Sequence, residues 1–299
     1  AHIVERLEAA GYVREDRARP TDRMTYRVER YPMAAPAWEP LDASLAIVGE
    51  AEPVLRFATN RNMLATNSHA TPPGGVTAEL VDGGRGTAAE LGRLDVKGKV
   101  VYVEANVGRA FAEAVQRRGA LGVLGYALPD YLQPSKHVNS IQFGGVARDT
   151  VGRGWGIALS FAAKARLRAA LDAAARSGTP VRVQVMTDVR WTPNAVEQAV
   201  VADIRGSRAP DERFVFSAHV QEPGANDNAS GVGAQVEMAR VAAQLVRAGR
   251  TDPARTITFL WGLEIRSTDR YITQDSVRAR GIRWGLSLDM VGEDTKKTG

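Results

Sequence analysis

The chain has 299 residues, of which 44% are apolar and 24% charged, proportions that are ordinary for a globular protein long enough to form two domains. It contains no cysteine, which excludes disulfides and thiolate metal ligands. No apolar run approaches the roughly 20 residues that span a bilayer, so we predict no transmembrane helix. The formal net charge of +5 comes mainly from scattered arginines, and without a basic cluster interleaved with aromatics we expect no nucleic-acid partner.

The first forty residues predict a helix, a strand and a linker, in that order. Residues 2–11 place apolar side chains at helical spacing and stop at Gly11, which is typical of a short amphipathic helix. Residues 24–31 alternate like a strand, and the proline-rich stretch 32–40 predicts a linker. The sequence begins with a helical pattern and without an initiator Met, and we predict no signal peptide within it. We therefore expect that a leader was removed or that the sequence is a fragment.

Residues 43–188 have a different pattern, in which short strands alternate with glycine-rich turns and no cluster of histidines and acids occurs. The glycines of 83–86 and 152–156 match neither a P-loop nor a dinucleotide fingerprint, so they predict turns. We interpret 43–188 as a small α/β domain inserted into a domain formed by 1–42 and 189–299. Within the insert we expect strands at 44–48, 76–81, 99–104, 121–126 and 181–186, and helices at 106–118 and 160–174.

After the insert, strand and helix patterns alternate to residue 291. This alternation predicts an α/β fold with a mainly parallel mixed sheet covered by helices on both faces. The expected elements are strands at 199–204, 213–219, 255–261 and 285–291, a loop at 205–212, and a helix at 228–248.

Four polar side chains lie where these strands end. His219 ends one strand, Glu264 follows the next, Asp289 lies near the end of the third, and Asp227 lies in the turn that opens the helix. Ligands bind outside the carboxyl ends of strands in open α/β sheets, and histidine with carboxylates suits a divalent transition metal. We therefore predict a metal centre of His219, Asp227 and Asp289, with Glu264 as general base or as a further ligand.

Each acid also has a simpler interpretation. Asp227 could cap the following helix, a role compatible with metal binding because a carboxylate has two oxygens. Glu264 could be an ordinary exposed residue. Asp289 lies in an otherwise apolar strand, where a buried carboxylate without a partner costs several kcal/mol, so we expect a metal to compensate it. The other histidines, His2, His69 and His137, have no acid at ligand spacing and are predicted to be structural.

These motifs resemble the zinc aminopeptidases of peptidase family M28. The resemblance rests on His219, the run Gly-Ala-Asn-Asp-Asn-Ala-Ser-Gly at 224–231, Trp-Gly-Leu-Glu at 261–264 and Leu-Asp-Met-Val-Gly at 288–292. Residues 43–188 are similar to the protease-associated domain that many members carry as an insertion. The resemblance implies a zinc exopeptidase of the phosphorylase/hydrolase-like fold that acts on peptides, and it implies a secreted, periplasmic or cell-envelope location.

The same resemblance implies roles for the site residues. His219 and Asp289 would hold the first of two zinc ions, Asp227 would bridge both, and Glu264 would be the base. Ile265 stands where the family has a glutamate ligand of the second ion, although a one-residue shift would make Glu264 that ligand.

Two further departures from the family bear on the metal site. Gln221 stands where the family has an aspartate that orients the histidine. We expect Gln221 and Asn228 to contact the metal ligands rather than the metal itself. The family's last histidine is absent before Gly299, which favours a truncated sequence. One and two zinc ions therefore both stay open.

Two other functions are compatible with these departures. One is a mononuclear relative, such as a glutaminyl-cyclase-like acyltransferase. The other is a non-catalytic binding homologue of the transferrin-receptor type. Neither the residue preference of the substrate nor the oligomeric state is indicated by the sequence.

Overall fold

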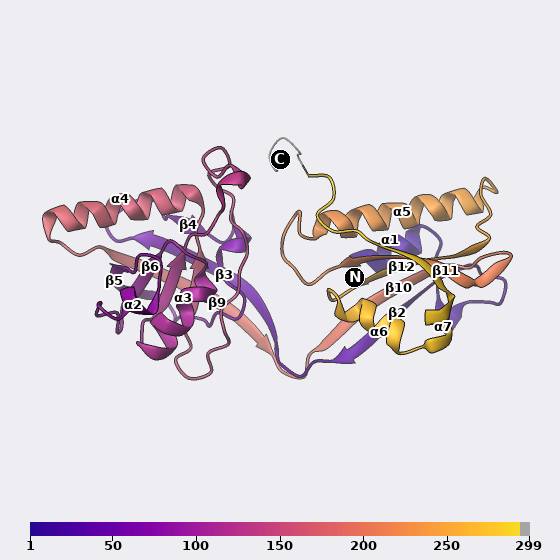
Figure 1. Ribbon diagram of the computed structural model, residues 1–299, viewed down its shortest axis with the longest axis horizontal. Coiled ribbons are helices and arrows are strands. Elements are labelled where there is room, and N and C mark those ends of the chain that lie inside the picture. The colour runs from indigo at the N-terminus through magenta and orange to yellow at the C-terminus, as the bar shows by residue number, and fades with distance from the viewer. Residues whose placement is uncertain (294–299) are drawn as a thin grey trace. The chain divides into compact units, whose positions relative to one another are not determined.

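The computed structural model describes residues 1–293 (Figure 1). These residues form two compact units, one of residues 1–35 and 194–293, and one of residues 36–193. We call them the outer unit and the inserted unit. The inserted unit begins and ends in two long strands, β3 (Ala37–Ile47) and β9 (Arg182–Thr192), which pair antiparallel. The predicted limits of the insert, 43 and 188, fall within these two strands.

The outer unit is built on a six-stranded mixed sheet in the order β1-β2-β10-β12-β11-β13. β11 pairs parallel with both β12 and β13, whereas β10 is antiparallel to both of its neighbours. The α/β class with a mixed sheet is thus confirmed. The strands are β1 (Val13–Arg14), β2 (Met24–Pro32), β10 (Val196–Ile204), β11 (Ala209–His219), β12 (Arg255–Gly262) and β13 (Ile282–Ser287).

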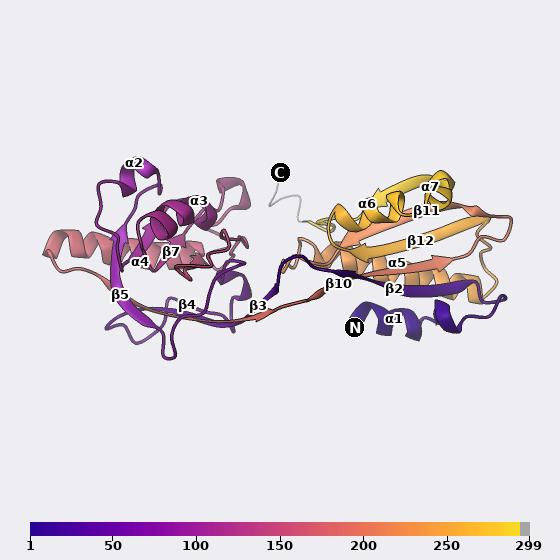
Figure 2. The ribbon, with the colours of Figure 1, turned by 90° about the horizontal axis from the view of Figure 1, so that it is seen from below.

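Helices cover both faces of this sheet, as predicted (Figure 2). One face carries α1 (His2–Ala9) and α5 (Ala229–Arg247), and the other carries α6 (Arg266–Thr273) and α7 (Ser276–Gly281). Successive side chains of β12 point alternately toward the two faces of the sheet. Phe259 and Trp261 lie in one apolar cluster with Ala239 of α5, whereas Leu260 lies in another with Tyr271 of α6. A strand buried on both faces is a continuous apolar run, which is why residues 255–261 were recognisable.

β13 differs from the strand predicted at 285–291. It ends at Ser287, and it lies at the edge of the sheet, where only β11 pairs with it. Among the described residues nothing covers most of its side chains, and Trp284 and Leu286 are about half exposed. The prediction of a buried strand was therefore wrong, because an apolar sequence does not distinguish a central strand from an edge strand.

The inserted unit holds a seven-stranded sheet in the order β4-β3-β9-β5-β6-β7-β8. β5 to β8 are parallel, and β3, β4 and β9 are antiparallel to their neighbours. Apolar side chains of α4 and of α3 belong to two separate clusters of the core. The remaining elements are β4 (Leu55–Arg56), β5 (Val76–Asp82), β6 (Val100–Val103), β7 (Gly122–Gly125), β8 (Trp155–Ala158), α2 (Ala88–Leu91), α3 (Val107–Phe111), which continues as a π-helix (Ala112–Arg117), and α4 (Phe161–Ser177).

Three loops predicted from sequence are partly strands. The expected linker 32–40 shrinks to four residues between β2 and β3, and Pro40 is accommodated because the pairing of β3 with β9 is irregular beside it. β11 begins at Ala209, before the expected loop 205–212 has ended, and its register with β12 shifts between Ala209 and Arg213. Trp155 and Gly156 belong to β8. Prolines and glycines often predict turns, but they also occur within strands, at sheet irregularities and where backbones pack closely.

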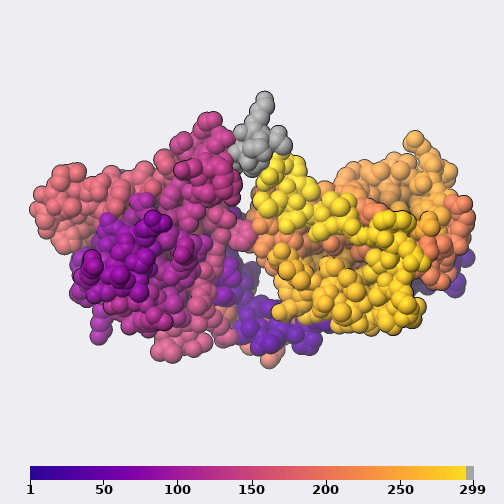
Figure 3. All heavy atoms as spheres, viewed as in Figure 1, coloured from indigo at the N-terminus to yellow at the C-terminus, as the bar shows by residue number. Residues whose placement is uncertain are grey.

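The surface of the outer unit toward the viewer in Figure 3 is formed largely by the segment from α6 to β13, drawn in yellow. No helix among residues 1–293 has the length and apolar character needed to cross a bilayer.

Candidate functional site

Three parallel strands bring the predicted residues to one edge of the outer sheet. β11 ends at His219, Glu264 follows the end of β12, and Asp289 follows the end of β13. Because β11 is parallel to both neighbours, all three carboxyl ends lie on the same side. Asp227 reaches this edge from the turn between β11 and α5. The structure thus brings together all four side chains that the sequence singled out.

The ring of His219 faces two of these acids. Its Nε2 atom lies 3.4 Å from an oxygen of Asp289 and 3.6 Å from an oxygen of Asp227. One possible ligand atom from each of the three residues lies within 4.8 Å of the others. The His219 side chain is only 7% exposed, whereas those of Asp227 and Asp289 are 33% and 44% exposed. The prediction of a buried Asp289 was therefore wrong, and its carboxylate needs no metal to compensate burial.

The fit of these residues to a metal ion rests instead on polar atoms without partners. Neither ring nitrogen of His219 has a hydrogen-bond partner among the described residues, and the same holds for Oδ1 of Asp227. Buried polar atoms left unpaired are uncommon in proteins and costly. Imidazole nitrogens and carboxylate oxygens are donors that zinc accepts, and catalytic zinc sites have three protein ligands. The residues present therefore fit a divalent metal, and ligation by them stays a prediction.

Asn228 joins the start of α5 to the chain around Asp289. Its side chain is buried, and its oxygen accepts the backbone N–H of Gly231 at 3.1 Å and of Met290 at 3.3 Å. Its amide nitrogen donates to the carbonyl of Leu288 at 3.0 Å. The peptide bond between Asp227 and Asn228 is cis. Asn228 is thus the N-cap of α5 and also holds both neighbours of Asp289, which is compatible with its predicted supporting position.

Glu264 follows β12 and Asp289 follows β13, the two strands that flank β11 in the sheet, and Glu264 is held through its backbone. The side-chain oxygen of Gln221 accepts the Glu264 N–H at 2.9 Å. An amide oxygen can accept a ring N–H, but in the structure the partner of the Gln221 oxygen is Glu264 and not His219. Ile265 is 78% exposed and has φ of 57°, so the position that the family uses for a second glutamate carries an apolar side chain in solvent.

Glu222 belongs to the site and was not predicted. Its Oε2 atom lies 3.4 Å from Nδ1 of His219, and it forms a second group of possible ligands with His219 and Glu264. Burial, followed by a hydrogen bond with Asp227 and the negative charge of that residue, raises the pKa of Glu222 to about 7. Its place three residues after His219 is a signal that the sequence does contain.

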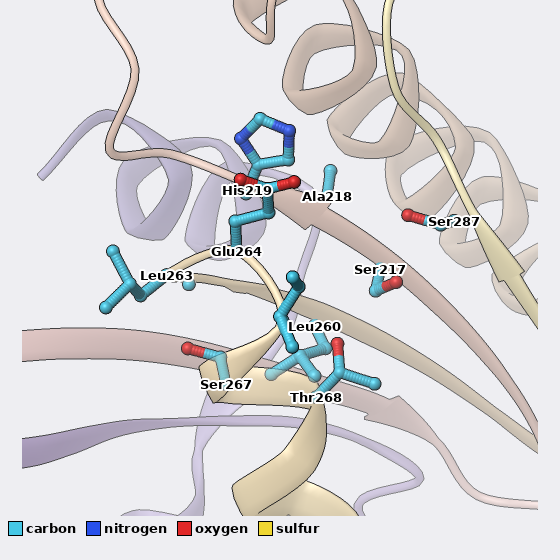
Figure 4. Close-up of a pocket in the computed structure, with 11 residues that line it drawn as sticks. Ser217, Ala218, His219, Leu260, Leu263, Glu264, Ser267, Thr268 and Ser287 are labelled. Atoms are coloured by element: carbon cyan, nitrogen blue, oxygen red, sulfur yellow. The ribbon is translucent and has the colours of Figure 1, made fainter.

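A small hollow opens beside these residues (Figure 4). His219 and Glu264 lie at one end of the hollow, which is open to solvent. Ser267 lines it with a buried hydroxyl that has no hydrogen-bond partner in the described part of the chain. The other lining residues include Ser217, Leu260, Leu263, Thr268 and Ser287.

Comparison with known proteins agrees with the expected family. Residues 199–298 match the model of peptidase family M28, and this stretch includes every predicted site residue. A search of curated protein sequences found no match. The recognition of family M28 is thereby confirmed for this stretch, whereas the kinship of the inserted unit with the protease-associated domain stays a prediction.

Several solved structures share the fold. A zinc aminopeptidase from Bacillus subtilis has a TM-score of 0.60 and 18% identity over 99% of this chain and 63% of its own. An aminopeptidase from Aneurinibacillus sp. strain AM-1 has a TM-score of 0.54 and 20% identity over 98% and 64%. A peptidase M28 precursor from Shewanella amazonensis has a TM-score of 0.61 and 18% identity over 96% and 64%. The chain thus spans less than two thirds of the length of these structures.

Proposed function

We propose that this protein, whose residues 199–298 match peptidase family M28, is a zinc-dependent aminopeptidase that removes N-terminal residues from peptides. The observation that carries the proposal is the convergence of His219, Asp227 and Asp289 at the carboxyl ends of parallel strands. Their ring nitrogens and one carboxylate oxygen have no hydrogen-bond partner within residues 1–293. The similarity in fold to a zinc aminopeptidase and to a second aminopeptidase supports it.

In this proposal His219, Asp227 and Asp289 hold the metal. A bound zinc ion would act as a Lewis acid that polarises the scissile carbonyl and makes water acidic enough to react near neutral pH. Glu264 lies beside the metal-binding residues, and its carboxylate would accept a proton from the attacking water and pass it to the leaving amine. Gln221 holds the backbone of Glu264 at this place.

The number of metal ions that the site can hold depends on which acids lie near His219. Ile265 offers no ligand, but Glu222 and Glu264 lie within ligand distance of each other beside His219. We propose at least one zinc ion in the group of His219, Asp227 and Asp289. A mononuclear acyltransferase of the glutaminyl-cyclase type is the second candidate, because Ile265 removes the glutamate that the family uses for its second ion.

The test combines metal content with activity. We expect elemental analysis to find one or two zinc ions per chain, and we expect hydrolysis of aminoacyl-4-nitroanilides that a chelator abolishes and added zinc restores. Substitution Glu264→Gln should reduce turnover by about 100-fold or more without removing the metal. Glu237→Gln, a matched change on the exposed face of α5, should leave turnover unaltered.

Other results would select the alternatives. One zinc ion with cyclisation of glutaminyl peptides, and no release of nitroaniline, would identify the acyltransferase. A protein that binds no zinc and hydrolyses no peptide substrate would instead be a binding homologue, and the proposal would be wrong.

A further inference from the structure

We infer that Glu222 is a positioning residue for His219, which accepts a hydrogen bond from Nδ1 and so directs the lone pair of Nε2 toward Asp227 and Asp289. This inference deepens the proposed function, because it concerns the same site and rests on that site binding a metal. It assigns a role to an acid that the motif at 219–231 does not explain.

The two nitrogens of His219 face different acids. Nε2 is directed toward oxygens of Asp289 and Asp227 at 3.4 and 3.6 Å, and Nδ1 toward Oε2 of Glu222 at 3.4 Å. The ring is only 7% exposed, so water has little access to either nitrogen. Neither nitrogen has a hydrogen-bond partner among the described residues. The acids nearest to each ring nitrogen therefore determine which partner suits that nitrogen.

The chemistry of a neutral imidazole makes these sides unequal. A neutral ring carries one N–H and one lone pair, and a metal takes the lone pair. A metal-binding histidine usually donates its other N–H to a carboxylate or carbonyl, which fixes the tautomer and the ring orientation. Two acids lie on the Nε2 side, so a cation is the partner that this side needs. Glu222 is the acid nearest to Nδ1, at 3.4 Å, with Glu264 in the same group, and an N–H on Nδ1 is the partner that satisfies the Glu222 carboxylate.

The neighbouring residue, Gln221, is engaged with Glu264 and not with His219. The oxygen of Gln221 already accepts the backbone N–H of Glu264 at 2.9 Å. Its amide nitrogen is a donor and has no affinity for an N–H group. Glu222 is half-buried, with 23% of its side chain exposed, and is thus partly shielded from solvent beside the ring. Residues 221 and 222 therefore have separate tasks, the first toward Glu264 and the second toward His219.

The test follows the ring of His219 without relying on catalysis. The full chain is labelled with ¹⁵N-histidine, freed of metal and studied by NMR at neutral pH, with His219→Gln identifying one signal among the four histidines. In the wild-type protein we expect the proton of His219 on Nδ1. In Glu222→Ala we expect this preference to be lost. In Glu222→Gln, whose amide oxygen can still accept an N–H, we expect it to be retained.

Calorimetric titration with zinc gives the second readout. Glu222→Ala should weaken zinc binding by about 10- to 100-fold, the range found when the partner of a metal-bound histidine is removed. Glu222→Gln should weaken it less, and Glu237→Gln should have the affinity of the wild type. A proton on Nε2 in the wild-type protein, or an unchanged zinc affinity in Glu222→Ala, would overturn the inference. Loss of one bound zinc in both Glu222 variants would overturn it too, since Glu222 would then be a ligand.

These outcomes are separate from those of the proposed function. A protein that binds zinc through a correctly oriented His219 but hydrolyses no peptide would refute the aminopeptidase and leave the role of Glu222 intact. An active peptidase in which Glu222→Ala leaves the His219 tautomer unchanged would support the aminopeptidase and refute the role of Glu222.

Discussion

The side-chain oxygen of Gln221 accepts the backbone N–H of Glu264 at 2.9 Å, and this bond ties the segment after β11 to the segment after β12. We predict that Gln221→Ala lowers turnover of an aminoacyl-4-nitroanilide by about 10- to 100-fold, because a base displaced by an ångström loses much of its effect. The midpoint of thermal unfolding should change by only a few degrees, about the effect of an exposed substitution.

Gln244→Ala is the matched control, since Gln244 is an exposed glutamine on α5 that contacts only Arg240 among the described hydrogen bonds of its side chain. Steady-state kinetics should give wild-type values for this variant. A wild-type turnover number for Gln221→Ala would show that Glu264 does not depend on the bond.

His219, Glu264 and Asp289 were predictable because each follows a strand of the outer sheet. Apolar runs covered on both faces, such as β12, are evident in sequence, and parallel pairing then sends their carboxyl ends to one edge. The sequence could therefore predict that these three residues meet at one edge, without any information about side-chain geometry.

The parts that were not predictable depend on which neighbours a segment meets. Nothing in the run 285–291 indicates that β13 is an edge strand, so the exposure of Asp289 was missed. The partners of Gln221 and Glu222 depend on how the loop after His219 folds back on the sheet, and two adjacent polar residues can exchange such roles. Local pattern determines the elements, whereas contacts between distant segments determine the surroundings of the site.

Gly231 lies where α5 passes the chain that leads to Asp289. A Cβ atom there would meet the carbonyl oxygen of Leu288 at 2.2 Å and the side-chain oxygen of Asn228 at 2.4 Å. We predict that Gly231→Ala destabilises the protein by about 1–3 kcal/mol, the usual range for overpacking, and that it weakens zinc binding because Leu288 adjoins Asp289. Urea unfolding and zinc titration measure the two effects.

Gly233, two residues further along the same helix, is the control. A Cβ atom there meets nothing within 4 Å. Gly233→Ala should therefore stabilise the protein by about 0.5–1 kcal/mol, the difference between glycine and alanine inside a helix. If both variants shifted stability in the same direction, the close approach of α5 to Leu288 would not be real.

Ile265 is the central residue of a tight turn, in which the N–H of Arg266 contacts the carbonyl of Glu264. Its φ and ψ are 57° and −54°, close to the rare and strained γ-turn, and a β-branched side chain is disfavoured at positive φ. Since the side chain is 78% exposed, little packing compensates this cost. We predict that Ile265→Gly stabilises the protein by about 1 kcal/mol or more, as measured by urea unfolding. Ile272→Gly, inside α6 and also exposed, should instead destabilise it.

Asp149 gives the inserted unit a stability that depends on pH. Burial raises the pKa of its carboxyl, but backbone N–H groups of Gly152, Gly154 and Val151 that donate to it outweigh this effect, so its pKa is below the ordinary value. A carboxyl whose pKa is depressed by folding stabilises the folded state above the unfolded pKa of about 3.9, and the contribution is lost as pH falls through the folded value.

Asp149→Asn tests this dependence, because the amide has the same shape but no charge. At neutral pH we expect it to cost about 1–3 kcal/mol, the range for loss of hydrogen bonds to a charged group. As pH falls below the unfolded pKa of about 3.9 toward the lower folded value, the advantage of the folded carboxylate is lost, so the two proteins should approach each other in stability. Calorimetric unfolding at a series of pH values measures the difference. A gap that is constant from neutral to acid pH would mean that Asp149 stabilises the loop by shape alone, because only the charged form can lose its advantage on protonation.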